Sequence, residues 1–140
     1  ISFMLPFNRE KSEPFWMNVA QSVSRGERIV LGTQNAQGTL VGTVQLIIEQ
    51  PENQPHRADV AKLLVHPSAR RGGLARELMN ELESCARQQG KTLLVLDTAT
   101  GSGAELFYHN CGWKKVGVIP DYAQMPDGTL TGTTLFYKTL

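Results

Sequence analysis

The chain has 140 residues, of which 41% are hydrophobic and 19% are charged, and its net charge at pH 7 is +1. This length allows one domain with one hydrophobic core and is too short for two ordinary domains. The composition is typical of a soluble globular protein and excludes a disordered or low-complexity chain. The near-neutral charge provides no general attraction to nucleic acid or to a membrane surface, so any anion must bind at a local site.

Membrane and metal signals are weak in this sequence. No apolar run reaches the roughly 18 residues that span a bilayer, and we find no secretory leader pattern at the start. The two cysteines, Cys85 and Cys111, have no second pair with which to form a metal cluster and are expected to be free thiols. His56, His66 and His109 lack metal-ligand spacing. We therefore expect a cytoplasmic protein that binds no metal.

The first part of the chain predicts a helix and a hairpin. Ser12 is the expected N-cap of a helix that ends at Gly26. The segments Arg28 to Gln34 and Thr39 to Gln50 flank the turn sequence Asn-Ala-Gln-Gly and predict two antiparallel strands. The apolar residues of the helix recur at helical spacing and are Phe15, Trp16, Val19, Ala20 and Val23.

The middle of the chain predicts a strand, a helix and a second strand. The run from Ala58 to Pro67 is almost continuously apolar, as expected of a strand covered on both faces. An amphipathic helix follows and closes at Gly90, and Thr92 to Thr98 is the second apolar strand. Such a unit normally forms a right-handed crossover between parallel strands. The apolar stripe of the helix is Leu74, Leu78, Leu82 and Cys85, and its expected polar face includes Glu83.

The last part of the chain predicts a short helix and two strands. Ser102 and Glu105 fit a capping box at the start of a helix that runs to about Cys111 and ends at Gly112. The strands are residues 113–120 and 131–140, joined by a loop with a Pro-Asp-Gly turn signal. Together the elements predict an α/β (α+β) domain with a single mixed sheet. That sheet is mostly antiparallel, has a central parallel strand pair and is flanked by helices.

A pair of arginines and a pair of glycines stand at the predicted start of the central helix. Helix N-termini carry unpaired N–H groups and the positive end of the dipole, so anions bind there. Gly72 and Gly73 let a phosphate approach the backbone, and Arg70 and Arg71 add charge beside it. The alternative is a tight turn with both arginines in water. The chain contains neither a nucleotide P-loop nor the dinucleotide fingerprint.

The run from Arg70 to Ala75 fits Gln/Arg-x-x-Gly-x-Gly/Ala, the acetyl-CoA signature of the Gcn5-related N-acetyltransferases. Later in the chain Tyr108 precedes the pair Gly112 and Trp113, as in a second motif of that family. The chain resembles the family over nearly its whole length, and within it most resembles the tabtoxin-resistance acetyltransferase group. The resemblance implies one domain over residues 1–140 that lacks the family's first strand and helix, which help to build the acceptor pocket.

The resemblance also implies direct transfer of an acetyl group from acetyl-CoA to an amine. It places the pyrophosphate on the backbone amides of the glycine-rich turn, and the pantetheine arm along the preceding strand as an added strand. The backbone N–H of Val65 would face the developing oxyanion. Tyr108 would protonate the departing thiolate, because a phenol with a pKa of about 10 can donate to a thiolate whose acid has a pKa near 8.5. The expected cofactor-binding residues are Leu64, Val65, Arg70, Arg71, Gly72, Gly73, Leu74, Ala75 and Tyr108.

The catalytic base stays open between Asp59 and Asp97. Asp59 interrupts the start of an apolar strand, and Asp97 lies at the carboxyl end of a parallel strand, where ligands of open sheets collect. Burial would raise the pKa of either carboxylate toward a useful value. The structural alternatives are an ion pair of Asp59 with Arg57 or Lys62, and a purely turn-ordering role for Asp97.

The expected acceptor is a primary amine of a small molecule, such as an amino-acid-like, antibiotic or toxin compound. Tyr122 and Met125 are candidates for lining its site. Two alternatives are a catalytically degenerate module that binds acetyl-CoA and a protein N-acetyltransferase. The presence of Tyr108, Asp59 and Asp97 together favours the enzyme. The expected partners are acetyl-CoA and the amine, without nucleic acid or membrane, and a homodimer stays open.

Overall fold

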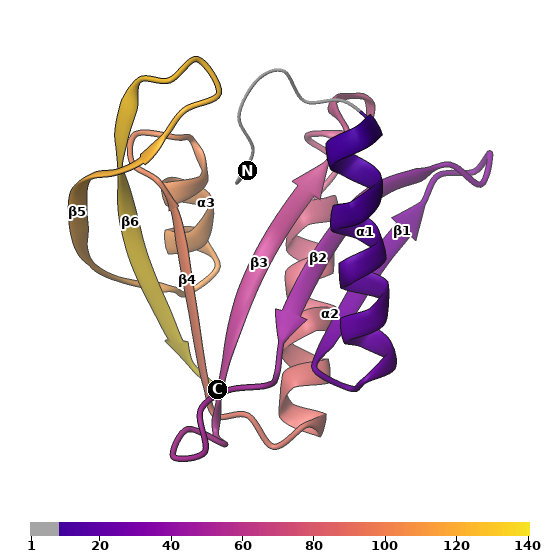
Figure 1. The fold of residues 1–140 in the computed structure, drawn as a ribbon, viewed down its shortest axis with the longest axis horizontal. Helices are drawn as coiled ribbons and strands as arrows, with labels where there is room; N and C mark the ends of the chain where they lie inside the picture. The colour runs from indigo at the N-terminus through magenta and orange to yellow at the C-terminus, as the bar shows by residue number, and fades with distance from the viewer. Residues whose placement is uncertain (1–8) are drawn as a thin grey trace.

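The computed structural model describes residues 9–140, with side chains from residue 17 onward. Six strands form one sheet in the order β1-β2-β3-β4-β6-β5 (Figure 1). β3 and β4 run parallel and the other neighbouring pairs run antiparallel, which confirms the predicted mixed sheet. The elements are α1 (Arg9–Ser24), β1 (Arg28–Gln34), β2 (Leu40–Ile47), β3 (Arg57–Val65), the 3-10 turn η1 (Pro67–Ala69), α2 (Leu74–Gln88), β4 (Leu93–Ala99), α3 (Ala104–Asn110), β5 (Lys114–Gln124) and β6 (Leu130–Thr139).

The two longer helices cover opposite faces of the sheet (Figure 1). The main core lies between α2 and the sheet, where Leu78, Met79 and Leu82 pack against residues of β2, β3 and β4. Full burial of such a side chain stabilises the fold by about 1.5–3 kcal/mol. The strand residues of this core include Val44, Leu46, Ala58, Val60, Leu94, Leu96 and Phe136. α3 adds Tyr108 to the same core, which places this residue against the sheet.

The buried face of α2 differs from the prediction at one charged position. Glu83 was expected on the polar face, but it is buried at 5% exposure, whereas Cys85 is only half-buried. The reason is an ion pair: Lys138 Nζ of β6 lies 2.8 Å from Glu83 Oε1. The same Nζ donates to the carbonyl of Cys111 at 2.7 Å, just after α3. One lysine therefore connects α2, β6 and the end of α3.

α1 begins at Arg9, so the prediction that Ser12 caps it is wrong. Arg, Glu and Lys at positions 9–11 are good helix formers and extend the helix past the serine. Val19 is buried as expected, but Ala20 and Val23 are exposed. The expected apolar residues Phe15 and Trp16 lie outside the described side chains.

A polar contact replaces part of the apolar face expected for α1. Arg28 of β1 donates to Ser22 of α1 at 3.0 Å and to Gln45 of β2 at 2.7 Å. Ser22 and Gln45 are 6% and 1% exposed, respectively. Buried polar groups need such partners, and the arginine supplies them. α1 is thus held on the sheet by hydrogen bonds as well as by Val19.

In the last third of the chain, the start of α3 and the end of β5 differ from the prediction. The capping box is wrong, because Gly103 is the N-cap of α3 and makes no side-chain cap bond, while Glu105 accepts a hydrogen bond from Thr134 of β6 instead. β5 continues through Pro120 to Gln124, four residues beyond the predicted end. Proline is tolerated there because β5 is an edge strand.

None of the helices in the described part of the chain has the length and apolar character of a membrane span.

Candidate active site

Four residues, from Arg70 to Gly73, connect η1 to α2. Arg71 and Gly73 both adopt left-handed backbone conformations, with φ of 69° and 78°. Gly73 is the N-cap of α2 and provides no side chain to cap the helix. The first N–H groups of an α-helix have no partner within the helix, so this end of α2 offers donors to an external anion.

The space beside this turn fits a phosphate group. A Cβ atom added to Gly72 would come no closer than 3.8 Å to another atom, and one added to Gly73 would meet nothing within 4 Å. The backbone there is therefore open to a ligand. Arg71 is exposed, and Arg70 Nε donates to the carbonyl of Val65 at 3.3 Å. The residues present thus fit a pyrophosphate bound by backbone N–H groups with arginine charge nearby.

Beside the turn, the two parallel strands separate. β3 and β4 pair from Arg57–Leu93 to Asp59–Val95 and no further, although both strands continue. Beyond that point β3 stays paired with β2, and β4 stays paired with β6. The far half of β3, which ends with Leu64 and Val65, therefore has an open edge toward β4. An extended ligand arm can add to such an edge by main-chain hydrogen bonds.

Asp97 lies on β4, just past Val95, the last residue of β4 that pairs with β3. Its Oδ2 accepts a hydrogen bond of 2.7 Å from Thr133 Oγ1 of β6, and Thr133 is only 4% exposed. Across the separation, Lys62 of β3 has a left-handed backbone with φ of 56°. Burial lowers the pKa of Lys62, and the negative charge of Asp97 opposes that shift. The carboxylate of Asp97 thus faces the open part of the sheet and is held by a buried hydroxyl.

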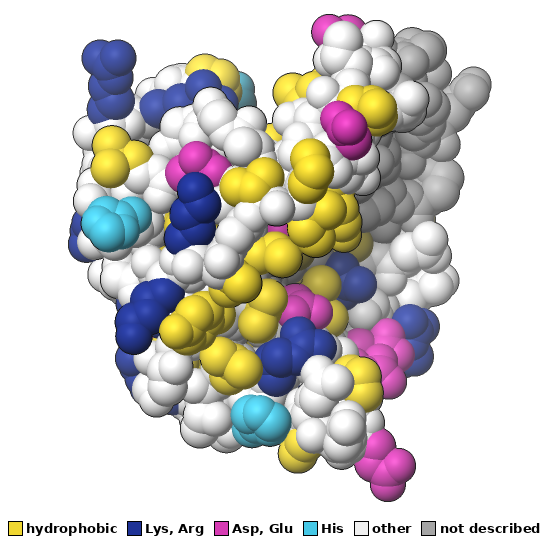
Figure 2. All heavy atoms as spheres, turned by 90° about the vertical axis from the view of Figure 1, so that its left-hand side faces the viewer, with side chains coloured by type: hydrophobic (Ala, Val, Ile, Leu, Met, Phe, Trp, Pro, Cys, Tyr) yellow, Lys and Arg dark blue, Asp and Glu magenta, His cyan; other side chains and the backbone are white. Residues whose placement is uncertain are grey.

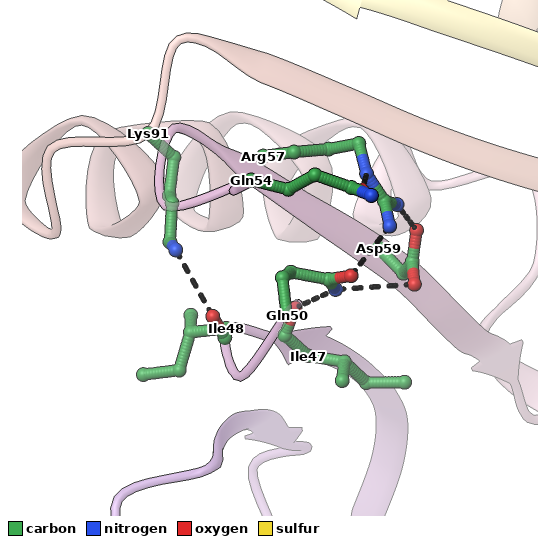
Figure 3. A network of polar contacts seen from close by, with 7 residues as sticks. All are labelled: Ile47, Ile48, Gln50, Gln54, Arg57, Asp59 and Lys91. Atoms are coloured by element: carbon green, nitrogen blue, oxygen red, sulfur yellow. Dashed lines mark hydrogen bonds and ion pairs between the residues drawn. The ribbon is translucent and has the colours of Figure 1, made fainter. Parts of the chain in front are cut away.

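Asp59 has a different environment, shown in Figure 3. Its carboxylate forms an ion pair with Arg57, and Gln50 Nε2 donates to it at 3.1 Å. Arg57 in turn donates to Gln50 and Gln54. The structure therefore places Asp59 in a network that joins β3 to the loop before it, at the closed end of the strand separation. It does not bring Asp59 and Asp97 together.

Tyr108 packs in the core with only 8% exposure. Its ring lies 5.3 Å from Phe107, 6.0 Å from Trp113 and 5.8 Å from Phe136, measured between ring centroids. Burial, with a smaller contribution from the negative charge of the Cys111 thiolate, raises the pKa of Tyr108 to about 12. Its hydroxyl makes no hydrogen bond with the described residues, and it stays protonated at neutral pH. The group is therefore a neutral phenol that can act as a hydrogen-bond donor.

The sequence did not single out the threonines that organise this region. Thr133 holds Asp97, and the neighbouring Thr134 donates to Glu105 and contacts Thr100 Oγ1 at 3.0 Å. Thr134 is fully buried and ties α3 to β6. Threonine is common in strands, so its presence carried no specific signal.

The other residues considered from the sequence lie in or beside η1, β5, α2 and α3. His66 caps η1, with its Nδ1 accepting from the backbone N–H of Ser68 at 3.1 Å. Tyr122 in β5 and Met125 just after it are exposed at 57% and 40%. Cys85 and Cys111 are free thiols. No three His, Cys, Asp or Glu side chains in the described part of the chain are grouped so that they could hold a metal ion.

A mixed sheet whose parallel strands separate beside a helix N-terminus that is open to an anion is typical of the acyl-CoA N-acyltransferases. Residues 3–113 match the model of the acetyltransferase (GNAT) family. The chain therefore belongs to this family, and it is an acetyltransferase that uses acetyl-CoA as the acetyl donor.

Solved structures confirm the fold. A ribosomal-protein-alanine N-acetyltransferase from Brucella melitensis is 24% identical with a TM-score of 0.79, over 91% of this chain and 78% of that one. A protein from Salmonella typhimurium, solved with its cofactor acetyl-CoA, is 18% identical with a TM-score of 0.79, over 99% and 79% of the two chains. An aminoglycoside 6'-N-acetyltransferase complexed with coenzyme A is 19% identical with a TM-score of 0.73, over 95% and 81%. At these levels of sequence identity the similarity shows a shared fold and does not identify the acceptor substrate of this chain.

Proposed function

We propose that this acetyltransferase moves the acetyl group directly to the primary amine of a small molecule. The observation that carries the proposal is the position of Asp97, which faces the open part of the sheet where β3 and β4 have separated. The proposed phosphate-binding turn begins α2, and Tyr108 lies on α3, packed against the sheet. Acetyl-CoA supplies the activated acetyl group when it is bound.

The turn from Arg70 to Gly73, with Leu74 and Ala75, would hold the pyrophosphate, and the open edge at Leu64 and Val65 would align the pantetheine arm. In the transfer, a bond forms between the amine nitrogen and the acetyl carbon while the carbon–sulfur bond breaks. Asp97 would accept the proton that the amine loses, directly or through water. Tyr108 is the proposed donor of a proton to the sulfur: its phenol is neutral at neutral pH, although burial raises its pKa and so makes it a weaker acid than an exposed tyrosine.

Asp97 is favoured over Asp59 as the base. The carboxylate of Asp59 is occupied by Arg57 and Gln50, so its role in the network is to fix the start of β3. Asp97 accepts a hydrogen bond from Thr133 and has an exposed side chain that leaves room for an amine. The presence of the Asp97 carboxylate and the Tyr108 phenol also favours an enzyme over a degenerate binding module.

Several broader features belong to the same proposal. We place the protein in the cytoplasm, in keeping with its free thiols, and treat residues 1–140 as one acetyltransferase domain. The segments Leu-Leu-Val-Leu-Asp-Thr-Ala-Thr-Gly-Ser and Ile-Pro-Asp-Tyr-Ala-Gln-Met-Pro-Asp-Gly support kinship with the tabtoxin-resistance group. The near-neutral charge favours a small acceptor over a strongly charged macromolecule.

A homodimer through β5 completes the proposal. Hydrophobic side chains run in a band across the face that carries β5 and β6 (Figure 2). Val116, Val118 and Ile119 of this edge strand are 65%, 45% and 43% exposed. A second copy is the favoured partner, because two antiparallel β5 strands centred on Val118 would cover the exposed hydrophobic residues of both copies. Such a pairing of identical edge strands fits a two-fold axis.

The test is a transfer assay with purified protein, acetyl-CoA and a panel of small primary amines. Release of coenzyme A thiol, together with the acetylated amine identified by mass spectrometry, would support the function. A folded protein that binds acetyl-CoA but acetylates only protein N-termini or lysines would contradict the small-molecule assignment. Binding without any transfer would favour the degenerate module.

A further inference from the structure

An apolar groove opens beside the end of β3. Its volume is about 510 Å³, and its walls include Val30 of β1, Leu40 and Val41 of β2, and Leu64 of β3. Of the described residues that line it, none is an Asp, Glu, Lys or Arg. Ligand pockets for small molecules lie in this size range and are mostly apolar.

The groove opens on the face of the sheet opposite to α2. A Cβ atom at Gly42 would lie 3.0 Å from Leu78 and 3.3 Å from Leu74, so Gly42 faces α2. Side chains alternate along a strand, so its neighbours Val41 and Thr43 point to the other face. The phosphate-binding turn begins α2, and the groove therefore lies across the sheet from it. The donor and the acceptor can therefore approach the strand separation from different sides of the sheet.

The groove also reaches the proposed transfer point. Val65 and His66 line it, and Val65 ends the open edge along which the pantetheine arm is proposed to align. Thr43 lines it as well, and the Oγ1 of Thr43 is buried with no hydrogen-bond partner among the described residues. Buried hydroxyls are normally paired, so this one is suited to a polar atom of a ligand.

We propose that this groove binds the apolar body of the acceptor, an uncharged aliphatic or aromatic group that carries the primary amine. The inference rests on the proposed function and adds the acceptor's chemical class to it. A polyamine or an aminoglycoside would bury further cationic groups without a carboxylate among the described walls, which is unfavourable. An arylalkylamine buries its ring there and keeps its single amino group for Asp97.

The experiment measures binding of 2-phenylethylamine and of the diamine putrescine to the protein saturated with coenzyme A, by NMR titration. The test variant is Leu40→Glu and the matched control is Leu130→Glu. Both leucines begin a strand after a turn and have similar exposure, 56% and 59%, but only Leu40 lines the groove. Both variants are expected to fold, because each new carboxylate reaches water.

We expect wild type and Leu130→Glu to bind 2-phenylethylamine at least tenfold more tightly than putrescine, and Leu40→Glu to lose that preference. Equal or tighter putrescine binding by wild type, or an unchanged preference in Leu40→Glu, would overturn the proposal. It would also be overturned if hexanoyl-CoA bound at least tenfold more tightly than acetyl-CoA and Leu40→Glu removed that advantage, because the groove would then hold the donor's acyl chain. Binding is measured without turnover, so a failure of acetyl transfer is a separate result that affects only the proposed function.

Discussion

Thr133 Oγ1 donates a hydrogen bond of 2.7 Å to Asp97 Oδ2, joining β6 to the open end of β4. The donor is buried and the acceptor is exposed, so the sheet orients the carboxylate while its other side stays open to a ligand. A hydrogen bond to a charged group contributes about 1.5–3 kcal/mol. Thr133→Val should therefore lower kcat/KM by about tenfold while the fold is retained, as measured by steady-state kinetics and circular dichroism.

If Asp97 is the base, Asp97→Asn should lower kcat/KM by about 100-fold or more. The acidic limb of its pH profile should also disappear. The matched control is Asp59→Asn, which removes the other carboxylate from the Arg57 and Gln50 network. That variant should keep the wild-type pH profile and lose thermal stability. If instead Asp59→Asn abolishes the acidic limb and Asp97→Asn keeps it, Asp59 is the catalytic base.

Tyr108→Phe should reduce kcat far more than it weakens acetyl-CoA binding, because the proton donor is lost while the packed ring stays. Equal kcat in a folded variant would remove Tyr108 from the mechanism. Stopped-flow kinetics and calorimetry of the same preparation separate the two effects.

The raised pKa of Tyr108, about 12 when folded against about 10 in an unfolded chain, also makes a stability prediction. Below pH 10 both states keep the proton and the effect is absent. Between pH 10 and pH 12 the unfolded state loses the proton first, so the folded state becomes less stable as the pH rises. At pH 11 the loss is about 1 kcal/mol. Urea unfolding at pH 9 and pH 11 should show this extra loss in wild type and not in Tyr108→Phe.

The ion pair between Glu83 and Lys138 is nearly buried, with side-chain exposures of 7% and 23%. Lys138→Met removes the close partner of the buried carboxylate, leaves it with the more distant Arg87 Nη2 at 3.9 Å, and should lower the free energy of unfolding by about 3 kcal/mol. The double variant Glu83→Leu with Lys138→Met removes both charges and should recover most of that loss. Urea denaturation of the two variants measures this difference. If the double variant is as unstable as the single one, the charge pair is not the cause.

The β5 interface predicts a concentration-dependent dimer in sedimentation experiments. Val118→Lys should shift the protein toward the monomer, because it places two like charges at the proposed two-fold axis. Leu106→Lys on α3 is the control, since Leu106 is exposed at 67% and lies off β5. A wild-type protein that stays monomeric at high concentration would contradict the interface.

The sequence predicted most of the fold because its periodicities are local. The parallel unit from Ala58 to Thr98, the closing Gly90 and the glycine-rich turn all follow from neighbouring residues. The errors come from long-range contacts. Glu83 is buried because it forms an ion pair with Lys138, which lies more than fifty positions later in the chain. Glu105 does not cap α3 because its carboxylate accepts a hydrogen bond from Thr134. The hydrogen bond from Thr133 to Asp97 joins two strands, and the groove beside Val65 is lined by residues of separate strands. No local sequence pattern therefore indicated either feature.

The most direct test of the account is calorimetric titration of acetyl-CoA into wild type, Gly72→Val and Gly117→Val. Neither glycine needs a left-handed backbone, and a Cβ atom at either position meets nothing closer than 3.8 Å, so both variants should fold. Only Gly72 lies in the proposed phosphate-binding turn. We predict that Gly72→Val weakens acetyl-CoA binding by about tenfold or more, while Gly117→Val and wild type bind alike and prefer coenzyme A thioesters to ATP. Unchanged affinity in a folded Gly72→Val protein would contradict the assignment of this turn as the cofactor site.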